Sequence, residues 1–306
     1  MPLFIIQPRV YNTFMAKNGI CILNAYDILP GAEHFYERMS EELARLGITL
    51  EKRTNAEIFS YIDSSGALAG EKLPADFILY LDKDLYASYS LEKRGYRLFN
   101  PARAIELCDD KMRTHLALAN QGIRMPKTIA GPLNYSTNSS LAFVKAVEDQ
   151  LRFPIVAKEN FGSLGAKVYL LQNHQDLVNF EDVHRYAPRL YQEFIASSKG
   201  MDYRIILVGG NFVAGMKRVN HQGDFRSNVA LGGSGEKVEI PAEFVRIAEK
   251  AASLLHLDYA GADVLIGPKG EPILCEVNSN AFIQGIEKVT GVNVAAAYAR
   301  HIAATL

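Results

Sequence analysis

The sequence predicts an α/β protein whose C-terminal part is of the α+β type. In the first hundred residues, apolar runs of strand length alternate with amphipathic helical stretches, which is the pattern of a parallel sheet with helices outside it. Beyond about residue 125 the strands follow one another closely, and two pairs have the form of hairpins with Gly-Gly-Asn and Pro-Lys-Gly turns. A chain of 306 residues is long enough to form two or three domains of these kinds.

The first part is expected to alternate strand and helix in chain order. Its expected elements are strand 19–26, helix 33–47, strand 48–54, a short helix at 55–60, strand 75–82, helix 85–95, strand 96–100 and helix 109–122. It has no GxGxxG turn, so a dinucleotide is not indicated. Asn24, Tyr26, Asp82 and Lys83 stand at strand ends, where open α/β sheets place ligands, although loop caps would look the same.

The second part is expected to be richer in antiparallel pairs. Its expected elements are strands 153–159, 166–172 and 189–195, hairpins 203–219 and 260–278, and helices 139–150, 175–185, 242–256 and 292–305. The change of pattern predicts an N-terminal domain at 1–108, a central subdomain at 109–197 and a C-terminal subdomain at 198–306.

Composition excludes several classes of partner. The formal net charge is -1, which gives no overall electrostatic attraction to nucleic acid or to an anionic membrane. The three cysteines are widely spaced, as in a reduced protein without a structural zinc site or disulfide frame. The apolar run at the start of the sequence is too short for the core of a signal peptide. No stretch approaches the ~20 uninterrupted apolar residues of a membrane-spanning helix. We therefore expect a cytoplasmic protein, and leave a homo-oligomer open.

The hairpin at 260–278 carries candidate metal ligands. If residues 268–271 form its loop, Asp263 lies opposite Glu276, and Leu265 lies opposite Leu274. Two facing carboxylates repel unless a cation lies between them. With the carbonyl of Asn278 they form an all-oxygen set that suits Mg²⁺ or Mn²⁺. The alternative is a register shifted by one residue, with one carboxylate in solvent.

Two lysine and glycine features suit a phosphate. Lys158 ends an apolar strand and is followed by Gly162-Ser163-Leu164-Gly165, so a cation and free backbone N–H groups could surround phosphate. A hairpin with two turn glycines is the alternative. Lys217, Arg218, Arg226 and Asn228 precede Gly232-Gly233, which suits a site where charge develops during phosphoryl transfer. Here a solvated basic loop is the alternative.

The strand at 189–195 leaves into a polar loop. Backbone groups at its exit, from Gln192 to Ile195, could hydrogen-bond an adenine edge, and Asp202 or Lys199 could reach a ribose hydroxyl. An ordinary strand followed by a glycine turn explains the same residues.

The order of these motifs resembles the ATP-grasp superfamily and, more narrowly, the RimK-like α-L-glutamate ligases. The most specific stretches are "MKRVNHQGDFRSNVALGG" and "EVNSNAFIQGIEKVTG", and the resemblance covers about residues 96–300. It implies an ATP-grasp fold, with an N-terminal parallel α/β pre-domain and the nucleotide between two α+β subdomains. It also implies an ADP-forming ligase that joins a small-molecule or peptide carboxylate to an amino-acid amine through an acyl phosphate.

The resemblance implies site roles as well. Lys111 and Lys158 would hold the ATP phosphates, and Glu193 and Phe194 would lie at the adenine. Arg204 and Arg218 would stabilise the phosphate or acyl phosphate, and Arg226 would contact the nucleotide or the activated acyl group. Asp263, Glu276 and Asn278 would bind two Mg²⁺ or Mn²⁺ ions. The full set implied for the nucleotide is Lys111, Lys158, Gly162, Ser163, Leu164, Gly165, Gln192, Glu193, Phe194, Ile195, Lys199, Asp202, Arg226, Ser227, Asn228, Leu265 and Leu274.

One segment departs from the family pattern. After "EVNS" the chain has Asn280-Ala281-Phe282, where RimK-like enzymes more often carry a small-residue Pro-Gly turn. Because this segment would adjoin the acceptor, three functions stay open: a glutamate-adding ligase, an ATP-grasp ligase that uses another amine in amino-acid or peptide natural-product synthesis, and a nucleotide-binding protein without turnover.

Overall fold

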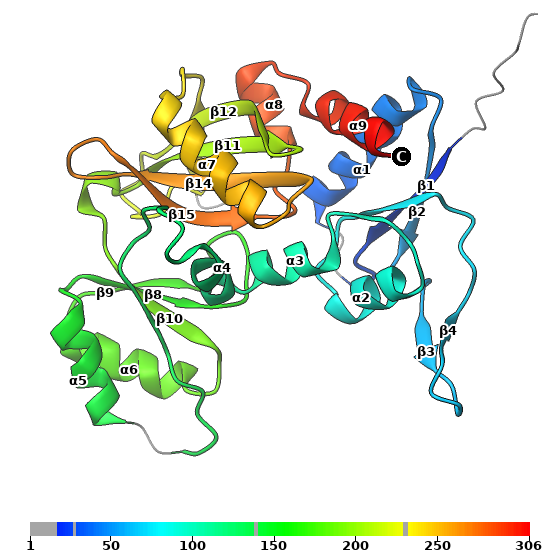
Figure 1. Ribbon diagram of the computed structural model, residues 1–306. Coiled ribbons are helices and arrows are strands. Elements are labelled where there is room, and N and C mark those ends of the chain that lie inside the picture. Colours follow the sequence, from blue (N-terminus) through cyan, green and yellow to red (C-terminus); the bar gives the residue numbers. More distant parts are fainter. Residues whose placement is uncertain (1–16, 27–28, 138–139, 229–231) are drawn as a thin grey trace, which may run out of the picture.

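The protein is described from a computed structural model, which covers residues 17–26, 29–137, 140–228 and 232–306. Three sheets with their helices form three parts of the molecule (Figure 1). The N-terminal part lies at the right of this view, the central part at the lower left and the C-terminal part at the upper left. Among the described residues, no helix is long and apolar enough to span a bilayer.

The N-terminal part is a parallel sheet with strand order β2-β1-β5-β6, which confirms the predicted α/β arrangement. Helix α1 has Pro30 as its first residue, and α2 follows the aspartate cap Asp84, which accepts hydrogen bonds from two backbone N–H groups of α2. The elements are β1 (Asn18–Leu23), α1 (Pro30–Ala44), β2 (Thr49–Thr54), β5 (Phe77–Tyr80), α2 (Leu85–Lys93) and β6 (Leu98–Phe99).

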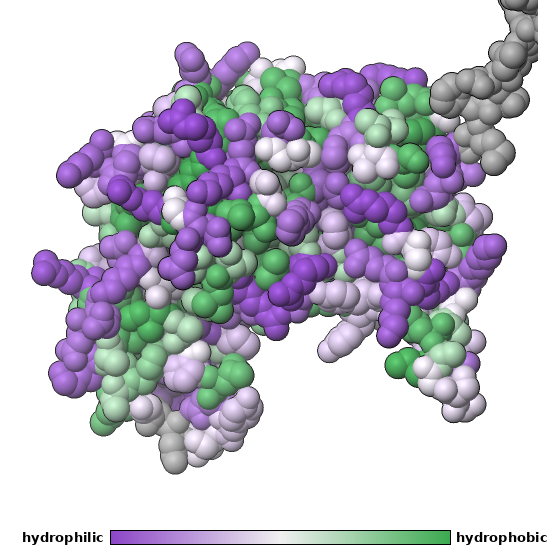
Figure 2. Space-filling view, viewed as in Figure 1, coloured by the Kyte–Doolittle hydropathy of each residue, from purple (hydrophilic) through white to green (hydrophobic). Residues whose placement is uncertain are grey.

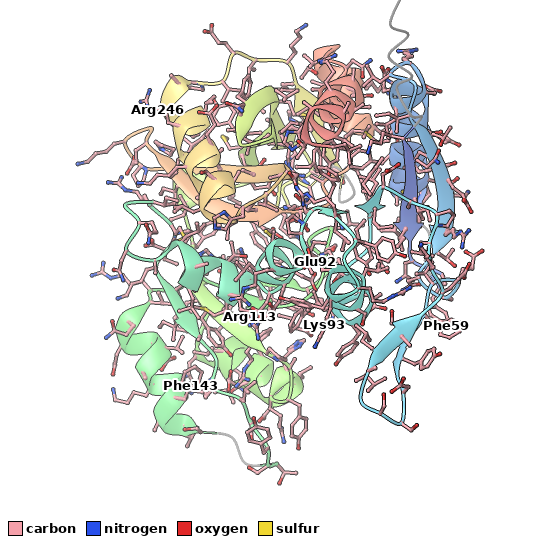
Figure 3. All side chains as sticks on the ribbon, turned by 45° about the vertical axis from the view of Figure 1, so that its right-hand side comes forward. Phe59, Glu92, Lys93, Arg113, Phe143 and Arg246 are labelled. Atoms are coloured by element: carbon pink, nitrogen blue, oxygen red, sulfur yellow. The ribbon has the colours of Figure 1, made fainter. Side chains whose placement is uncertain are left out.

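Two expected elements of this part are wrong. The segment 55–60 is not a helix but a turn that leads into a two-stranded antiparallel hairpin, β3 (Ser60–Ile62) and β4 (Leu68–Gly70). This hairpin projects from the body, and Phe59 is exposed at its base (Figure 3). The helix expected at 109–122 has other bounds: it is α4 (Lys111–Leu118), which begins at Lys111 because Asp110 is extended and caps it, and the preceding helix α3 (Ala102–Asp109) was not expected.

The central part is an antiparallel sheet with strand order β7-β10-β8-β9, covered by α5 and α6. Its core is its own, and includes Val147 and Leu177 from the helices and Tyr191 from the sheet. The elements are β7 (Thr128–Ala130), α5 (Leu141–Gln150), β8 (Ile155–Glu159), β9 (Val168–Leu171), α6 (His174–His184) and β10 (Arg189–Glu193).

The C-terminal part is an antiparallel sheet with strand order β13-β12-β11-β14-β15. Helix α7 covers one face of it, since Phe244 and Ala248 pack against Ile205 and Ala262 of the sheet. The elements are a 3-10 helix η1 (Ala196–Ser198), β11 (Met201–Val208), β12 (Asn211–Asn220), β13 (Gly233–Glu236), α7 (Ala242–Leu254), β14 (Tyr259–Ile266), β15 (Pro272–Asn278), α8 (Gln284–Thr290) and α9 (Val294–Thr305). The elements that the sequence analysis did not predict are β3, β4, α3, β7, η1, β13 and α8.

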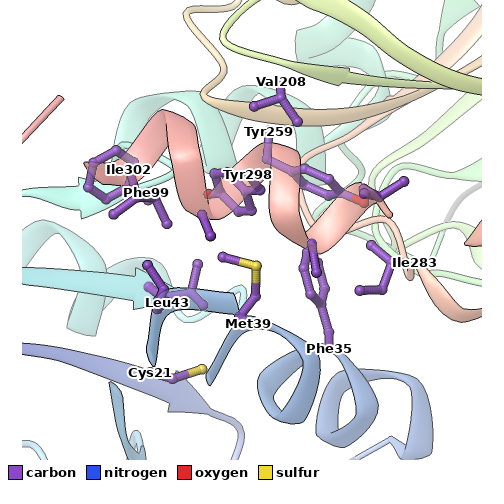
Figure 4. Close-up of a cluster of buried hydrophobic side chains, with 14 of the residues drawn as sticks. Cys21, Phe35, Met39, Leu43, Phe99, Val208, Tyr259, Ile283, Tyr298 and Ile302 are labelled. Carbon is purple, nitrogen blue, oxygen red and sulfur yellow. The ribbon is translucent and has the colours of Figure 1, made fainter. Parts of the chain in front are cut away.

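One hydrophobic core joins the two ends of the chain. Phe35 and Met39 of α1 pack against Tyr298 and Ile302 of α9 and against Tyr259 of β14 (Figure 4). The predicted N-terminal and C-terminal units therefore share buried surface. The boundaries at 108/109 and 197/198 stay predictions.

Candidate active site

A cavity of about 970 Å³ lies where the three parts meet. Strand ends and loops of all three sheets line it: Asp82 after β5, Lys158 on β8, and Asp263 and Glu276 on β14 and β15. Its volume is within the range of small-molecule and cofactor sites. Figure 2 shows hydrophilic and hydrophobic side chains interspersed on the outer surface in the same view as Figure 1.

The hairpin of β14 and β15 has the predicted pairing only in part. Asp263 lies opposite Glu276, as counted from the sequence. A bulge then shifts the register, so Leu265 pairs with Ile273 and Leu274 pairs with Val264. The predicted pairing of Leu265 with Leu274 is wrong.

The bulge separates the two leucines. Leu265 lines the cavity, whereas Leu274 is buried in the core beneath α7 and does not line it. The extra residue is Cys275, so both Cys275 and Glu276 border the cavity. No sequence signal marked this bulge, because it depends on the packing of the opposite face.

Asp263 is held by two arginines of neighbouring strands. Arg204 Nη2 lies 2.9 Å from Asp263 Oδ2, and Arg218 Nη2 lies 3.0 Å from the same oxygen. Burial alone would raise the pKa of Asp263, but the two guanidinium groups outweigh burial and hold that pKa below its usual value. Arg218 also pairs with Asp202, at 2.7 Å from Nε to Oδ1. Burial would lower the pKa of Arg218, and the two carboxylates raise it instead.

Two lysines line the cavity close to β15. Lys158 Nζ lies 3.7 Å from Cys275 Sγ, and is buried. Lys111, the first residue of α4, donates from Nζ to the Gly162 carbonyl at 2.8 Å and lies 4.0 Å from Glu276 Oε1. Burial lowers the pKa of Lys111 below its usual value, and the nearby Glu276 opposes this.

The glycine turn at 162–165 joins β8 to β9, which pair antiparallel, so the hairpin alternative is correct for its backbone. The same turn lines the cavity. It accepts hydrogen bonds from three side chains: Lys83 Nζ at 3.1 Å from Ser163 Oγ, Lys111 Nζ at 2.8 Å from the Gly162 carbonyl, and Arg226 Nη1 at 2.7 Å from the Gly165 carbonyl.

The strand exit from Gln192 to Ile195 lines the cavity as expected. The Gln192 side chain donates to Thr128 Oγ1 at 3.0 Å, and Glu193 accepts from the Lys127 backbone N–H at 2.8 Å. Of the two residues predicted to reach the ribose, one lies at the cavity and the other does not. Asp202 lines the cavity but pairs with Arg218, and Lys199 is exposed and does not line it.

The remaining predicted residues, Arg226, Ser227 and Asn228, line the same cavity as the metal-ligand candidate Asn278. No histidine among the described residues lines it. His115 lies behind the wall, and burial lowers its pKa to about 4. In the described part of the chain no three acidic, histidine or cysteine residues form a metal cluster, so the candidate metal set consists of two carboxylates and an amide.

Of the strand-end guesses, Asn24, Asp82 and Lys83 line the cavity and Tyr26 does not. Sequence reasoning missed the start of α1, from its N-cap Leu29 to Ala32, and Lys288 on α8. Phe282 packs on Gly31, where an added Cβ would come within 2.5 Å of its ring, so the departing segment Asn280-Ala281-Phe282 closes this end of the cavity. The sequence signal for this end of the cavity was the departure of Asn280-Ala281-Phe282 from the family pattern.

Comparison with known proteins agrees with this geometry. Residues 108–302 match the RimK-like ATP-grasp domain. The chain is 37% identical to a probable alpha-L-glutamate ligase of Xanthomonas euvesicatoria pv. vesicatoria, over 69% of this chain and 70% of that one. It is 31% identical to human beta-citrylglutamate synthase B, over 74% of this chain and 58% of that one.

A solved structure has a similar fold. The ATP-grasp ligase PsnB, in complex with a minimal precursor, Mg and ADP, is 16% identical, has a TM-score of 0.66 and aligns over 94% of this chain and 97% of that one. The parallel N-terminal sheet and the two antiparallel sheets around the cavity are thus those of an ATP-grasp protein. The chain belongs to the RimK-like ATP-grasp family.

Proposed function

We propose that this protein is an ATP- and Mg²⁺-dependent ligase that joins a carboxylate to an amine, with glutamate as the added amino acid. The observation that supports this function most is the arrangement around one cavity. Lys111, Lys158 and the turn 162–165 line it together with the facing pair Asp263 and Glu276. Cations and oxygen ligands around one cavity are what phosphoryl transfer from ATP requires.

The donor set fits a hard divalent cation. Asp263, Glu276 and Asn278 offer only oxygens, which Mg²⁺ and Mn²⁺ prefer. Asp263 accepts from Arg204 and Arg218 and still has a free lone pair on Oδ1, because a carboxylate has about four acceptor positions. When bound, Mg²⁺ neutralises charge on the phosphate oxygens of ATP. A count of two ions is part of this proposal.

The chemistry has two steps. A carboxylate oxygen of the substrate attacks the γ-phosphorus of ATP, which gives an acyl phosphate and ADP. The amine then attacks the acyl carbon, the amide C–N bond forms and phosphate leaves. Arg204 and Arg218 neutralise charge near the transferring group, and the 162–165 turn excludes water that would hydrolyse the acyl phosphate.

The names of the relatives support glutamate as the amine, since both an alpha-L-glutamate ligase and a beta-citrylglutamate synthase are similar over more than two thirds of this chain. A different amine or a peptide carboxylate is the second candidate, because Asn280-Ala281-Phe282 departs from the family pattern and PsnB was solved with a precursor. The three cysteines are free thiols, as is usual in a reducing compartment, and the proposed location is the cytoplasm.

The test uses purified protein with Mg·ATP, L-glutamate and a panel of carboxylates that includes citrate and a peptide ending in glutamate. ADP, phosphate and AMP are measured separately. We expect ADP and phosphate that depend on the carboxylate, and a decrease of about 10²-fold or more in Glu276→Gln. The matched control is Glu271→Gln in the same hairpin, whose side chain pairs with Arg124 outside the cavity and whose loss should change the rate less than about twofold.

The products distinguish the alternatives. AMP and pyrophosphate would mean adenylation rather than an acyl phosphate. Metal-dependent ATP binding without turnover on any carboxylate would favour a nucleotide-binding protein without ligase activity. Equal loss in both glutamate variants would mean that the hairpin, rather than the Glu276 carboxylate, is responsible.

A further inference from the structure

One carboxylate of the cavity belongs to the N-terminal part. Asp82 follows β5, at the carboxyl end of the parallel sheet, where open α/β sheets place ligands. It lines the cavity although only 8% of the residue is exposed. The residues around β15 do not supply a general base for amide formation. The groups that surround Asp82 therefore decide whether it can act as this base.

The partners of Asp82 are all neutral donors. Its oxygens accept from Asn24 Nδ2 at 3.1 Å, from the Lys83 backbone N–H at 2.7 Å and from Asn55 Nδ2 at 2.9 Å. Among the described residues, no lysine, arginine or histidine forms an ion pair with it; the Lys83 ammonium group lies instead 2.6 Å from Asp109. A buried carboxylate with no cationic partner is costly, unless a cation comes from outside the chain.

The other carboxylates of the cavity differ in this respect. Asp202 and Asp263 are bound to arginines, and Glu276 lies beside Lys111 and within the candidate metal set. Glu193 is exposed at the strand exit. Asp82 is therefore the buried cavity carboxylate, within the described chain, whose charge no side chain balances.

Asp82 also lies near the reacting end of the cavity. Its carbonyl accepts from Asn280 Nδ2 at 3.0 Å, and Asn280 is two residues beyond the metal candidate Asn278. Its neighbour Lys83 contacts Ser163 of the 162–165 turn at 3.1 Å. Asp82 thus lies between the segment that follows β15 and the 162–165 turn, which would cover the phosphates.

From this position and this charge we infer that Asp82 binds the ammonium group of the incoming amine and accepts its proton. The ligand class is a primary amine, the α-amino group of an amino acid. This inference rests on the proposed ligase function and adds to it the residue that activates the nucleophile.

The step balances as follows. The ammonium group gives one proton to the Asp82 carboxylate and becomes a neutral amine. Its lone pair attacks the acyl carbon, the C–N bond forms, and the bond from the acyl carbon to the phosphate oxygen breaks with its electron pair on phosphate. The second proton of the nitrogen passes to the departing phosphate, and Asp82 later returns its own proton to solvent.

The charged groups around Asp82 suit a base. Burial raises the pKa of Asp82; the Lys83 N–H and Asn24 oppose this, and Asp84 and Asp109 add to it, while the Lys83 ammonium group pairs with Asp109. A base works best when its pKa lies near the working pH. Amide formation should therefore decline as the pH falls through the raised pKa of Asp82.

The experiment compares Asp82→Asn with Asp84→Asn. Asp84 lies two residues away, caps α2 and does not line the cavity, and asparagine is an equally good cap. Each protein receives Mg·ATP and citrate or L-glutamate as the carboxylate, with either L-glutamate or hydroxylamine as the amine. Hydroxylamine is largely uncharged at neutral pH, so it needs no base to attack an acyl phosphate.

We expect Asp82→Asn to lose amide formation with L-glutamate by about 10²- to 10⁴-fold, yet to form hydroxamate within about threefold of the wild type. Its residual amide rate should rise about tenfold per pH unit, as the free amine does. Asp84→Asn should keep both activities within about threefold, because Asp84 is not the main cause of the raised pKa of Asp82. An Asp82→Asn protein with unchanged amide formation, or with equal loss of amide and hydroxamate, would overturn the assignment.

A binding measurement keeps the test independent of turnover. Calorimetry titrates L-glutamate, and then the other common amino acids, into each protein saturated with Mg²⁺ and a non-hydrolysable ATP analogue. We expect binding to the wild type that is at least tenfold weaker in Asp82→Asn. Equal affinity in the two proteins, or no amino acid bound by the wild type, would overturn the amine site. Absence of hydroxamate from the wild type would instead contradict the proposed ligase chemistry.

Discussion

The N-terminal part and the central part are attached to the C-terminal sheet in opposite ways. The N-terminal part is joined by apolar packing, since Phe35 and Met39 of α1 share a core with Tyr298 and Ile302 of α9. The central part keeps its own core around Phe180 and meets the rest at the cavity through polar contacts. Arg246 on α7 and Phe143 on α5 mark the two separate halves in Figure 3.

This difference predicts which contacts between the parts persist and which rearrange when a ligand binds. Apolar cores are close-packed and resist rearrangement, whereas a few hydrogen bonds to a turn exchange readily for bonds to a ligand. We therefore expect the N-terminal and C-terminal parts to form one rigid base that carries Asp82 and the metal-ligand candidates of β14 and β15. The central part would act as the cover, with its 162–165 turn over the phosphates.

The largest expected effect comes from the shared core. Phe35→Ala should lower the free energy of unfolding by about 3–5 kcal/mol, because it leaves a cavity between Tyr259 and Tyr298. Hydrogen exchange should accelerate in β1 and in α9 together. The matched change is Phe180→Ala in the central core, where faster exchange should be confined to α6 and β8–β10. Exchange that spreads over the whole chain in both variants would contradict two separate cores.

A smaller effect is expected where polar groups join the same two parts. Asp258 accepts from Arg97 Nη2 with both oxygens, at 2.9 Å for Oδ1 and 2.8 Å for Oδ2, and its Oδ1 lies 2.8 Å from His301 Nε2. Asp258→Asn should cost about 1–3 kcal/mol of stability, measured by urea unfolding, because a charged acceptor of two partners is lost. Asp182→Asn, which loses only an exposed pair with Arg185, should change it by less than about 0.5 kcal/mol.

The smallest effect should fall on ligand binding rather than stability. Ser163→Ala removes the acceptor for Lys83 on the 162–165 turn, which is worth about 0.5–1.5 kcal/mol. We expect Mg·ATP affinity to change by about two- to tenfold, with an unchanged melting temperature. Ser136→Ala, in a central loop away from the cavity, serves as the comparison. A lower melting temperature in Ser163→Ala would mean that this turn is part of the rigid base.

Local pattern was enough to predict most of the architecture. Alternation of strand and helix predicted the parallel sheet of β1, β2, β5 and β6, and turn residues predicted both C-terminal hairpins. The elements that were missed are short, such as β7 and β13, or interrupted by a cap, such as the α3 and α4 pair at Asp110. Short strands carry too few residues for a period to emerge, and they form because a neighbouring strand is present.

For the candidate site, the sequence by itself determined that Asp263 and Glu276 face each other and that a glycine turn follows Lys158, because side-chain alternation and turn chemistry are local properties of the backbone. Only the tertiary structure decided that Cys275 bulges toward the cavity, that Leu274 turns into the core, and that Asp82 approaches Asn280 across 198 residues of sequence. These features depend on which surfaces pack together once the chain has folded, and a local sequence pattern does not determine that packing.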